Sequence, residues 1–252
     1  LLQNKLADLG FMNLEKKISF YNYMPFNRFK IKIKKEIVTF NEYNLNVENL
    51  KANHVSSFEW NNLISKKDTM LIDVRNNFEI KVGSFEGSIN PNTKNFSEFK
   101  KYIKNDMQNM KNKKIAIFCT GGIRCEKASA YMKKEGFKNV SQLKGGILQY
   151  LEDISLKNSK WKGECFVFDN RVSVLNEMKP GTYKLCHACR YPISTTDLKS
   201  KDYEKGISCP KCINKISKTK KMNLKERIKQ IEIAKKKGLY NPYIKNTPSD
   251  FS

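Results

Sequence analysis

The residue best placed to do chemistry in this 252-residue chain is Cys119, which directly follows the apolar run Ile115–Phe118. Gly121, Gly122 and Arg124 come next, and a helix-like segment begins there. Backbone N–H groups at a helix N-terminus point toward an anion, and the helix dipole favours negative charge there. A thiolate at such a position has a lowered pKa and is a good nucleophile. The order strand, Cys, Gly-Gly, Arg, helix therefore predicts a reactive thiol, with the two glycines turning loop amides toward the sulfur.

Four residues separate Cys119 from Arg124. Cysteine phosphatases wrap a phosphate with a Cys-x5-Arg loop, so this shorter loop predicts a tighter cradle, sized for a persulfide sulfur. The simpler alternative is a buried structural cysteine beside a glycine turn. Cys125 lies in the first turn of the helix and has two open interpretations. It either resolves an oxidised or persulfidated Cys119 as a disulfide or packs as a small side chain under the loop.

Four of the seven cysteines form two Cys-x2-Cys pairs separated by 19 residues, namely Cys186, Cys189, Cys209 and Cys212. Two such turns can bring four thiolates together in a tetrahedral site, a pattern typical of structural zinc. The alternative is four reduced thiols without a metal. The odd cysteine count and the absence of a signal-peptide pattern favour a reducing, cytoplasmic location over a disulfide framework.

The chain carries 48 basic and 25 acidic residues, a formal net charge of +23. Such an excess favours a polyanionic partner, most often nucleic acid, although a lysine-rich proteome would give the same balance. No apolar run is long enough to span a membrane. Two basic segments are candidate RNA contacts. Their residues are Arg28, Lys30, Lys32, Lys34 and Lys35 in the first segment, and Lys225, Arg227 and Lys229 in the second.

Alternating apolar strands and helices from residue 54 onward predict an α/β domain with a parallel sheet. The pattern divides the chain into residues 1–42, an α/β unit at 54–157, a Cys-rich segment at 161–215 and a basic helical tail at 216–252. Residues 161–175 have the pattern of a hairpin turning at Asp169–Arg171.

Both ends of the chain have their own patterns. Leu2, Leu6 and Leu9 predict a short helix that ends at Gly10. Phe29, Ile31 and Ile33 alternate with lysines and predict a strand that has one basic face and is extended by Ile37–Phe40. Near the other end, Asn223 and Glu226 have capping-box spacing and predict a helix start. Leu224, Ile228 and Ile231 would form its apolar stripe.

Three motifs together resemble one known family. The order Asp73-Val74-Arg75, Glu79, the Cys119 loop and Gly145-Gly146 is similar to the rhodanese domain. The segments 118–129, 163–171 and 186–190 resemble, more narrowly, the rhodanese-type tRNA uridine hydroxylases. The resemblance covers about residues 10–215. Family members begin with a small ferredoxin-like α+β domain, so residues 1–42 are expected to be the latter part of one.

This resemblance implies an enzyme that hydroxylates C5 of the uridine at the wobble position of tRNA. Molecular oxygen would be a co-substrate, the anticodon loop of tRNA the partner, and Cys119 the persulfide-bearing residue. Two alternatives stay open: a sulfurtransferase that works through a Cys119 persulfide, and a non-enzymatic RNA-binding module. No organic cofactor motif, such as a dinucleotide-binding fingerprint, is visible.

Overall fold

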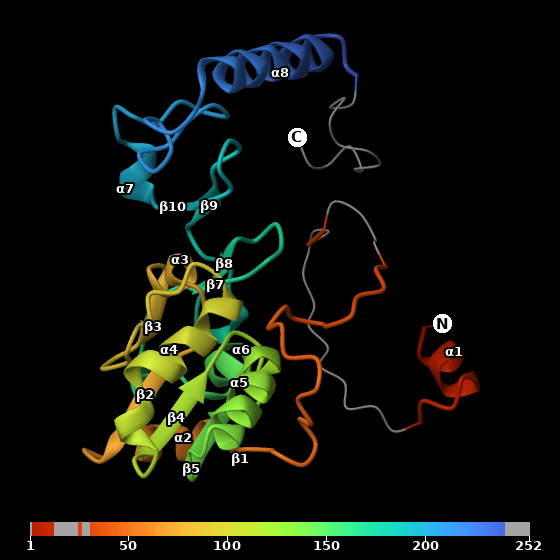
Figure 1. Ribbon diagram of the computed structural model, residues 1–252. Coiled ribbons are helices and arrows are strands. Elements are labelled where there is room, and N and C mark those ends of the chain that lie inside the picture. Colours follow the sequence, from red (N-terminus) through yellow and green to blue (C-terminus); the bar gives the residue numbers. More distant parts are fainter. Residues whose placement is uncertain (1, 13–24, 27–30, 240–252) are drawn as a thin grey trace.

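A four-stranded parallel sheet with strand order β1-β5-β4-β2 forms the centre of the structure, a computed structural model that describes residues 2–12, 25–26 and 31–239 (Figure 1). Its strands are β1 (Asn53–Val55), β2 (Thr69–Asp73), β4 (Lys114–Phe118) and β5 (Asn139–Leu143). β4 pairs with β2 on one side and β5 on the other, so Phe118 lies opposite Asp73. The central strand β4 therefore ends beside the predicted reactive loop.

Helices cover both faces of this sheet, as the apolar runs in its strands require. Ile115 and Ile117 of β4 pack on one face, and Ala116 and Phe118 pack on the other. The first face is covered by α4 (Phe99–Asp106) and α5 (Ile123–Lys134), and the second by α2 (Ser57–Ile64) and α6 (Gly146–Asp153). Ser56 caps α2 by accepting a hydrogen bond from Glu59 N. The predicted rhodanese-like α/β architecture is confirmed.

Several short helices and strands lie outside the parallel sheet. Helix α3 (Asn77–Ile80) precedes β3 (Gly83–Phe85), which pairs with β6 (Trp161–Gly163). The predicted hairpin is confirmed, because β7 (Cys165–Phe166) pairs antiparallel with β8 (Ser173–Val174). Short 3-10 turns complete the connections: η1 (Phe96–Glu98), η2 (Gln108–Met110), η3 (Leu156–Asn158) and η4 (Asn176–Met178).

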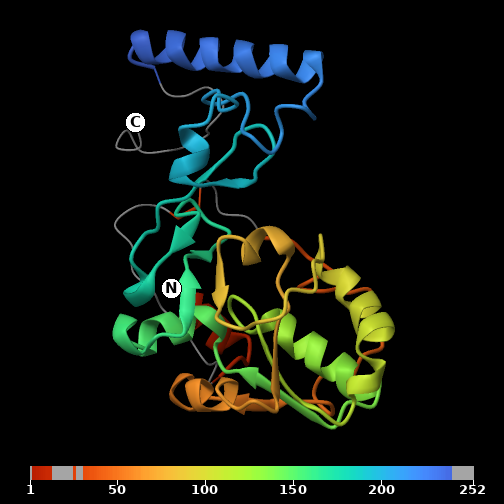
Figure 2. The same cartoon turned by 90° about the vertical axis from the view of Figure 1, so that its left-hand side faces the viewer.

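Residues 184–216, the Cys-rich segment proper, contain the four paired cysteines and lie beyond this hairpin. Their elements are β9 (Lys184–Leu185), β10 (Pro192–Ile193) and α7 (Thr195–Leu198), and the long helix α8 (Lys218–Lys236) follows them (Figure 2). The prediction that α8 starts at Asn223 is wrong, because Ser217 already accepts a hydrogen bond from the Lys220 amide at 3.2 Å and caps the helix six residues earlier. Of the predicted apolar stripe, Leu224 packs against the core of the Cys-rich segment, and Ile228 and Ile231 are partly buried.

The strand predicted over residues 29–33 is wrong where the structure describes it, since residues 31–40 contain no strand. Ile31 and Ile33 are 80% and 102% exposed. A strand needs a partner for its hydrogen bonds, and the described residues offer it none. The chain instead places Phe40 in the core of the α/β domain, stacked on Phe96 at a centroid distance of 4.6 Å.

The predicted helix at the start of the chain is confirmed as α1 (Leu2–Asp8), and Gly10 follows it at φ 84°. A further strand expected at Ile18–Tyr23 lies outside the described residues, as do Arg28, Phe29 and Lys30. The ferredoxin-like assignment of residues 1–42 therefore stays a prediction. None of the helices in the described ranges is long and apolar enough to cross a bilayer.

Candidate active site and four-cysteine centre

The Cys119 loop connects β4 to α5 and is held in place by the start of α6. The carbonyl oxygen of Cys119 accepts a hydrogen bond from Ile147 N at 2.9 Å, and that of Thr120 accepts one from Leu148 N at 3.1 Å. Gly146 has φ +68°, and a methyl group there would lie 2.6 Å from both carbonyl oxygens. Only glycine permits this close approach, which turns the loop carbonyls toward α6 and away from the thiol.

The Cys119 sulfur is buried and lies in an environment that favours the thiolate. Burial by itself raises the pKa of the thiol. A hydrogen bond from the Cys125 side chain, the positive charge of Arg124 and the backbone N–H groups of Cys125 and Arg124 outweigh that effect. They lower the pKa of Cys119 from 9.0 to about 6. A parallel role for the amides of Gly121 and Gly122 stays a prediction.

The other two thiols of the domain behave differently. Burial, together with the neighbouring Cys119 thiolate, raises the pKa of Cys125 well above its ordinary value. Burial likewise raises the pKa of Cys165 to about 12, and this side chain lies in the core. Cys125 thus packs under the loop and also contacts Cys119, so both of its predicted roles remain compatible with the geometry.

We expect alkylation of Cys119 by iodoacetamide to accelerate as the pH rises through about 6 and then to level off. The lowered pKa means that the thiolate predominates above that pH. Cys165 is the matched control, because it is equally buried but stays protonated until the pH approaches about 12. Peptide mass spectrometry after timed labelling gives both rates. A Cys119 midpoint near 9, or equal labelling of the two residues at neutral pH, would contradict the assignment.

Arg124 is fixed by a carboxylate from a different part of the chain. Its two terminal nitrogens donate to the two oxygens of Glu79 at 2.6 and 2.7 Å, and one of them also donates to Thr120 Oγ1 at 3.1 Å. Glu79 is fully buried in α3, where its carboxylate also accepts from Asn76 N at 3.1 Å. This bidentate pair holds the guanidinium beside the Cys119 thiolate.

The sequence patterns do not identify Glu79 as a site residue, although its spacing from Asn76 carries local structural information. Its position three residues after Asn76 matches a capping box, which the structure confirms. That spacing explains the start of α3 but says nothing about Arg124, which is 45 residues away in the chain. Gly146 was likewise recognised as part of a motif, whereas its contact with the loop carbonyls appears only in the folded chain.

We expect Glu79→Gln to lower the free energy of unfolding by about 3 kcal/mol, because it leaves the Arg124 charge buried without its counter-ion. Urea denaturation measures the change. The control is Glu86→Gln, since Glu86 forms a surface pair with Lys162 at 3.6 Å and both side chains are mostly exposed. Its expected effect is below about 0.5 kcal/mol. Equal losses of unfolding free energy in the two variants would show that the Glu79–Arg124 pair stabilises the protein no more than a surface pair does.

A second ion pair stabilises the wall next to the loop. Arg75 donates to the Asp73 carboxylate at 2.6 Å, and both side chains are completely buried. The guanidinium also donates to the Gly83 carbonyl at 2.6 Å and lies 5.1 Å from the centre of the Trp161 ring. These contacts connect the end of β2 to β3 and β6, so the pair has a structural role.

The four paired cysteines meet in one cluster. Their sulfur atoms all lie within 4.8 Å of one another, and three of the four residues are buried. Individual S···S distances are 3.8 Å for Cys186–Cys212, 3.8 Å for Cys189–Cys209 and 3.7 Å for Cys209–Cys212. A tetrahedron with Zn–S bonds of about 2.3 Å has edges of about 3.8 Å. The group can therefore bind a metal such as zinc, and its spacing is much too long for disulfides.

The candidate RNA-contact residues are not brought together at one site. Lys32, Lys34 and Lys35 are exposed but do not share the face of a strand. Lys225 and Lys229 are exposed on α8, whereas Arg227 is partly buried. In both views the Cys-rich segment separates α8 from the β4–α5 connection, so the structure does not bring the α8 residues to Cys119 (Figures 1 and 2).

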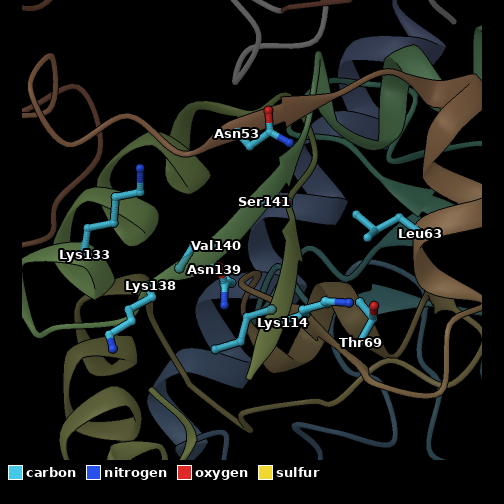
Figure 3. Close-up of a pocket in the computed structure, with 10 residues that line it drawn as sticks. Asn53, Leu63, Thr69, Lys114, Lys133, Lys138, Asn139, Val140 and Ser141 are labelled. Carbon is cyan, nitrogen blue, oxygen red and sulfur yellow. The ribbon is translucent and has the colours of Figure 1, made fainter. Parts of the chain in front are cut away.

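A cavity of about 330 Å³ lies at the end of the parallel sheet opposite to the Cys119 loop (Figure 3). It is lined by residues at the amino ends of the strands, among them Thr69, Lys114 and Asn139. Parallel strands present their carboxyl ends, not these ends, to the active-site loops of α/β folds. We therefore do not assign this cavity to the chemistry of Cys119.

Comparison with known proteins agrees with this geometry. The family model of the rhodanese-like domain matches residues 59–153. A rhodanese-related protein from Thermoplasma volcanium is 24% identical, covering 40% of this chain and 92% of its own, with a TM-score of 0.33. A human single domain sulfurtransferase is 22% identical, covering 42% of this chain and 100% of its own, with a TM-score of 0.36. The family match spans the sheet from β2 to β5, and the chain thus contains a rhodanese-like domain in which Cys119 lies in the loop between β4 and α5.

Proposed function

We propose that this protein modifies tRNA by oxygen-dependent 5-hydroxylation of the uridine at the wobble position. The observation that carries the proposal is the proximity of two segments that a minimal rhodanese-like domain lacks. Phe166 and Phe168 from the segment 163–171, and Tyr191 next to the segment 186–190, pack around Phe78 of α3. Phe78 directly precedes Glu79, the carboxylate that holds Arg124. The segments behind the family resemblance therefore contact α3, the helix that also carries the partner of Arg124.

In this proposal Cys119 is the reacting group. Its lowered pKa makes the thiolate available at neutral pH, either to attack or to carry a sulfane sulfur. Arg124 and the amides at the start of α5 stabilise negative charge on the sulfur. An anticodon loop offers unpaired bases, which leave the stack at a lower cost than bases in a duplex.

The proposal also assigns a structural zinc ion to the four clustered cysteines. Zinc fits four thiolates at these separations, and tetrahedral sites of this composition contribute directly to folding. Its role here would be to hold the Cys-rich segment in shape.

The decisive experiment is mass analysis of the nucleosides in tRNA. A strain that lacks the gene should lose 5-hydroxyuridine derivatives, and the full-length protein should restore them. Normal levels in the deletion strain would exclude the proposal.

A sulfurtransferase is the second candidate, because the Cys119 loop alone suffices for a persulfide. Sulfur transfer from a donor to an acceptor thiol needs neither the four-cysteine group nor a basic surface. A thiosulfate-to-cyanide assay separates the two candidates. Brisk turnover together with unchanged tRNA in the deletion strain would favour sulfur transfer.

We expect tRNA binding to weaken steeply with salt, with each phosphate contact adding about 0.7–0.9 to the log–log slope. Replacing the exposed Lys225 and Lys229 by Gln should lower the slope without disturbing α8, because Gln is a good helix former. The matched control changes Lys66 and Lys67 to Gln. These two exposed lysines lie between α2 and β2, at the end of the molecule opposite α8 (Figures 1 and 2). Equal slopes for both double variants would show that α8 does not contact RNA.

A further inference from the structure

A second cavity, of about 600 Å³, lies between α3, the β7–β8 hairpin and the Cys-rich segment. Its lining combines aromatic rings with backbone and charged groups from segments far apart in the sequence. The residues that matter for its chemistry are Phe26, Phe78, Phe166, Phe168, Arg190 and Tyr191. Neither the chemistry of Cys119 nor a metal at the four clustered cysteines accounts for these residues around an open space.

The rings are arranged edge to face, which leaves ring faces available to an occupant. Phe166 stands at 85° to Phe78 with centroids 5.1 Å apart, and Phe168 stands at 89° to Phe166 at 5.0 Å. Phe168 and Phe26 are nevertheless 65% and 58% exposed. Keeping large apolar rings in contact with water is unfavourable, so exposed aromatic rings around one cavity indicate a binding surface.

The charges around the cavity suit an anionic ligand. Arg190 is exposed and forms no ion pair within the described part of the chain. Lys211 Nζ lies 5.7 Å from the centre of the Tyr191 ring. Asp169 is the acidic residue in the lining, and Arg171 neutralises it by donating to its carboxylate at 2.6 and 3.0 Å. Aromatic faces next to unpaired basic groups are typical of sites for single-stranded nucleic acid.

The turn that carries Cys186 and Cys189 forms part of one wall of this cavity, because Cys189, Arg190 and Tyr191 line it. Arg190 N donates to the Cys186 carbonyl at 2.8 Å, and Cys186 N donates to the Tyr191 carbonyl at 3.0 Å. Arg190 has φ 63°, a left-handed conformation that a side-chain-bearing residue adopts only where the surroundings enforce it. The turn that contains Cys186 and Cys189 thus fixes the position of Arg190 and Tyr191 relative to Phe78.

We propose that this cavity binds one unpaired nucleobase of an RNA loop, stacked on Phe168 and its neighbours, with Arg190 close to the adjoining phosphate. Because Phe78 and Glu79 are consecutive in α3, an occupied cavity lies next to the residue that orients Arg124. The occupant is a base other than the one that reaches Cys119, since neither Cys119 nor Arg124 lines the cavity. This inference rests on the proposed function for its choice of RNA.

The test compares Phe168→Ala with Phe58→Ala in the full-length protein. Phe58 is 70% exposed on α2 and does not line the cavity, so it matches Phe168 in residue type and exposure. Two fluorescent RNA hairpins serve as probes: one with a normal single-stranded loop, and one of the same length whose loop nucleotides are abasic. Binding is titrated at one low salt concentration, and thermal unfolding confirms that each variant is folded.

Phe168→Ala should weaken binding of the normal hairpin about tenfold, because one stacking surface is lost. Phe58→Ala should leave binding unchanged. The abasic hairpin should bind the wild-type protein less tightly and should not distinguish wild type from Phe168→Ala. Unchanged binding by Phe168→Ala, or an equal loss with both hairpins, would overturn the proposal. Should Phe168→Ala prove destabilised, Arg190→Gln compared with Lys66→Gln replaces it, with a severalfold loss expected for Arg190→Gln alone.

Failure of this inference is distinct from failure of the proposed function. If the wild-type protein restores tRNA hydroxylation while Phe168→Ala binds the hairpin normally, the cavity assignment is wrong and the function stands. If Phe168→Ala loses loop binding but tRNA hydroxylation does not depend on the protein, the cavity assignment stands and the function is wrong.

Discussion

Replacing Cys119 by Ser is expected to lower tRNA hydroxylation by at least about 10³-fold, while the protein stays folded. Serine has nearly the same shape, but its hydroxyl does not ionise near neutral pH and carries no sulfane sulfur. The Cys119 thiolate, by contrast, is stabilised by Arg124, Cys125 and the amides of the α5 N-terminus. The loss should therefore appear in turnover and leave RNA affinity almost unchanged.

The measurement is nucleoside analysis of tRNA from a deletion strain that expresses each variant, together with hairpin binding in vitro. Cys165→Ala is the control, because Cys165 is equally buried in the core, whereas its raised pKa keeps its thiol protonated near neutral pH. It should retain hydroxylation. In a strain whose tRNA hydroxylation depends on the protein, normal hydroxylation by Cys119→Ser would refute the catalytic assignment of Cys119.

Metal removal is expected to have the second large effect, namely selective unfolding of the Cys-rich segment. Apart from the cysteines, the buried apolar residues of its core are Ala188 and Ile193, with four partly buried side chains packed against them. Such a core is too small to be stable alone, whereas structural zinc contributes about 10–16 kcal/mol in small domains. We expect about one metal ion per chain by elemental analysis.

The two tryptophans make this unfolding easy to localise. Trp60 and Trp161 are both buried in the core of the α/β domain, and the chain has no other tryptophan. Chelation should therefore leave tryptophan fluorescence unchanged while protease begins to cut between residues 184 and 216. Cys209→Ser should behave like the chelated protein, and Cys165→Ala should not. A metal-free protein whose Cys-rich segment resists protease would contradict the zinc assignment.

Local patterns in the sequence correctly predict many parts of this structure. The apolar run before Cys119 and the glycines after it predict the strand, turn and helix that the structure confirms as β4 and α5. The Cys-x2-Cys spacing predicts the thiol cluster in the same way. Both succeed because their residues are close in sequence, or in paired turns, so backbone preferences and ligand spacing determine the geometry.

Sequence patterns whose structure depends on a distant partner predict the fold less well. The alternation at Ile31 and Ile33 has the period of a strand, yet these residues form none. A strand is stable only when another strand accepts its hydrogen bonds, and the pattern carries no information about that partner. The start of α8 shows the same limit on a smaller scale, because two capping signals compete and Ser217 begins the helix before Asn223 can.

Residue types and spacing by themselves thus determined a thiol loop, a four-cysteine group and an α/β domain. The tertiary structure alone decided that Glu79 pairs with Arg124 and that Phe78 meets Phe166, Phe168 and Tyr191 around one cavity. Such contacts join residues far apart in the chain. They depend on how helices and strands pack in three dimensions, where burial and shape select the partners, and short-range sequence patterns do not encode that selection.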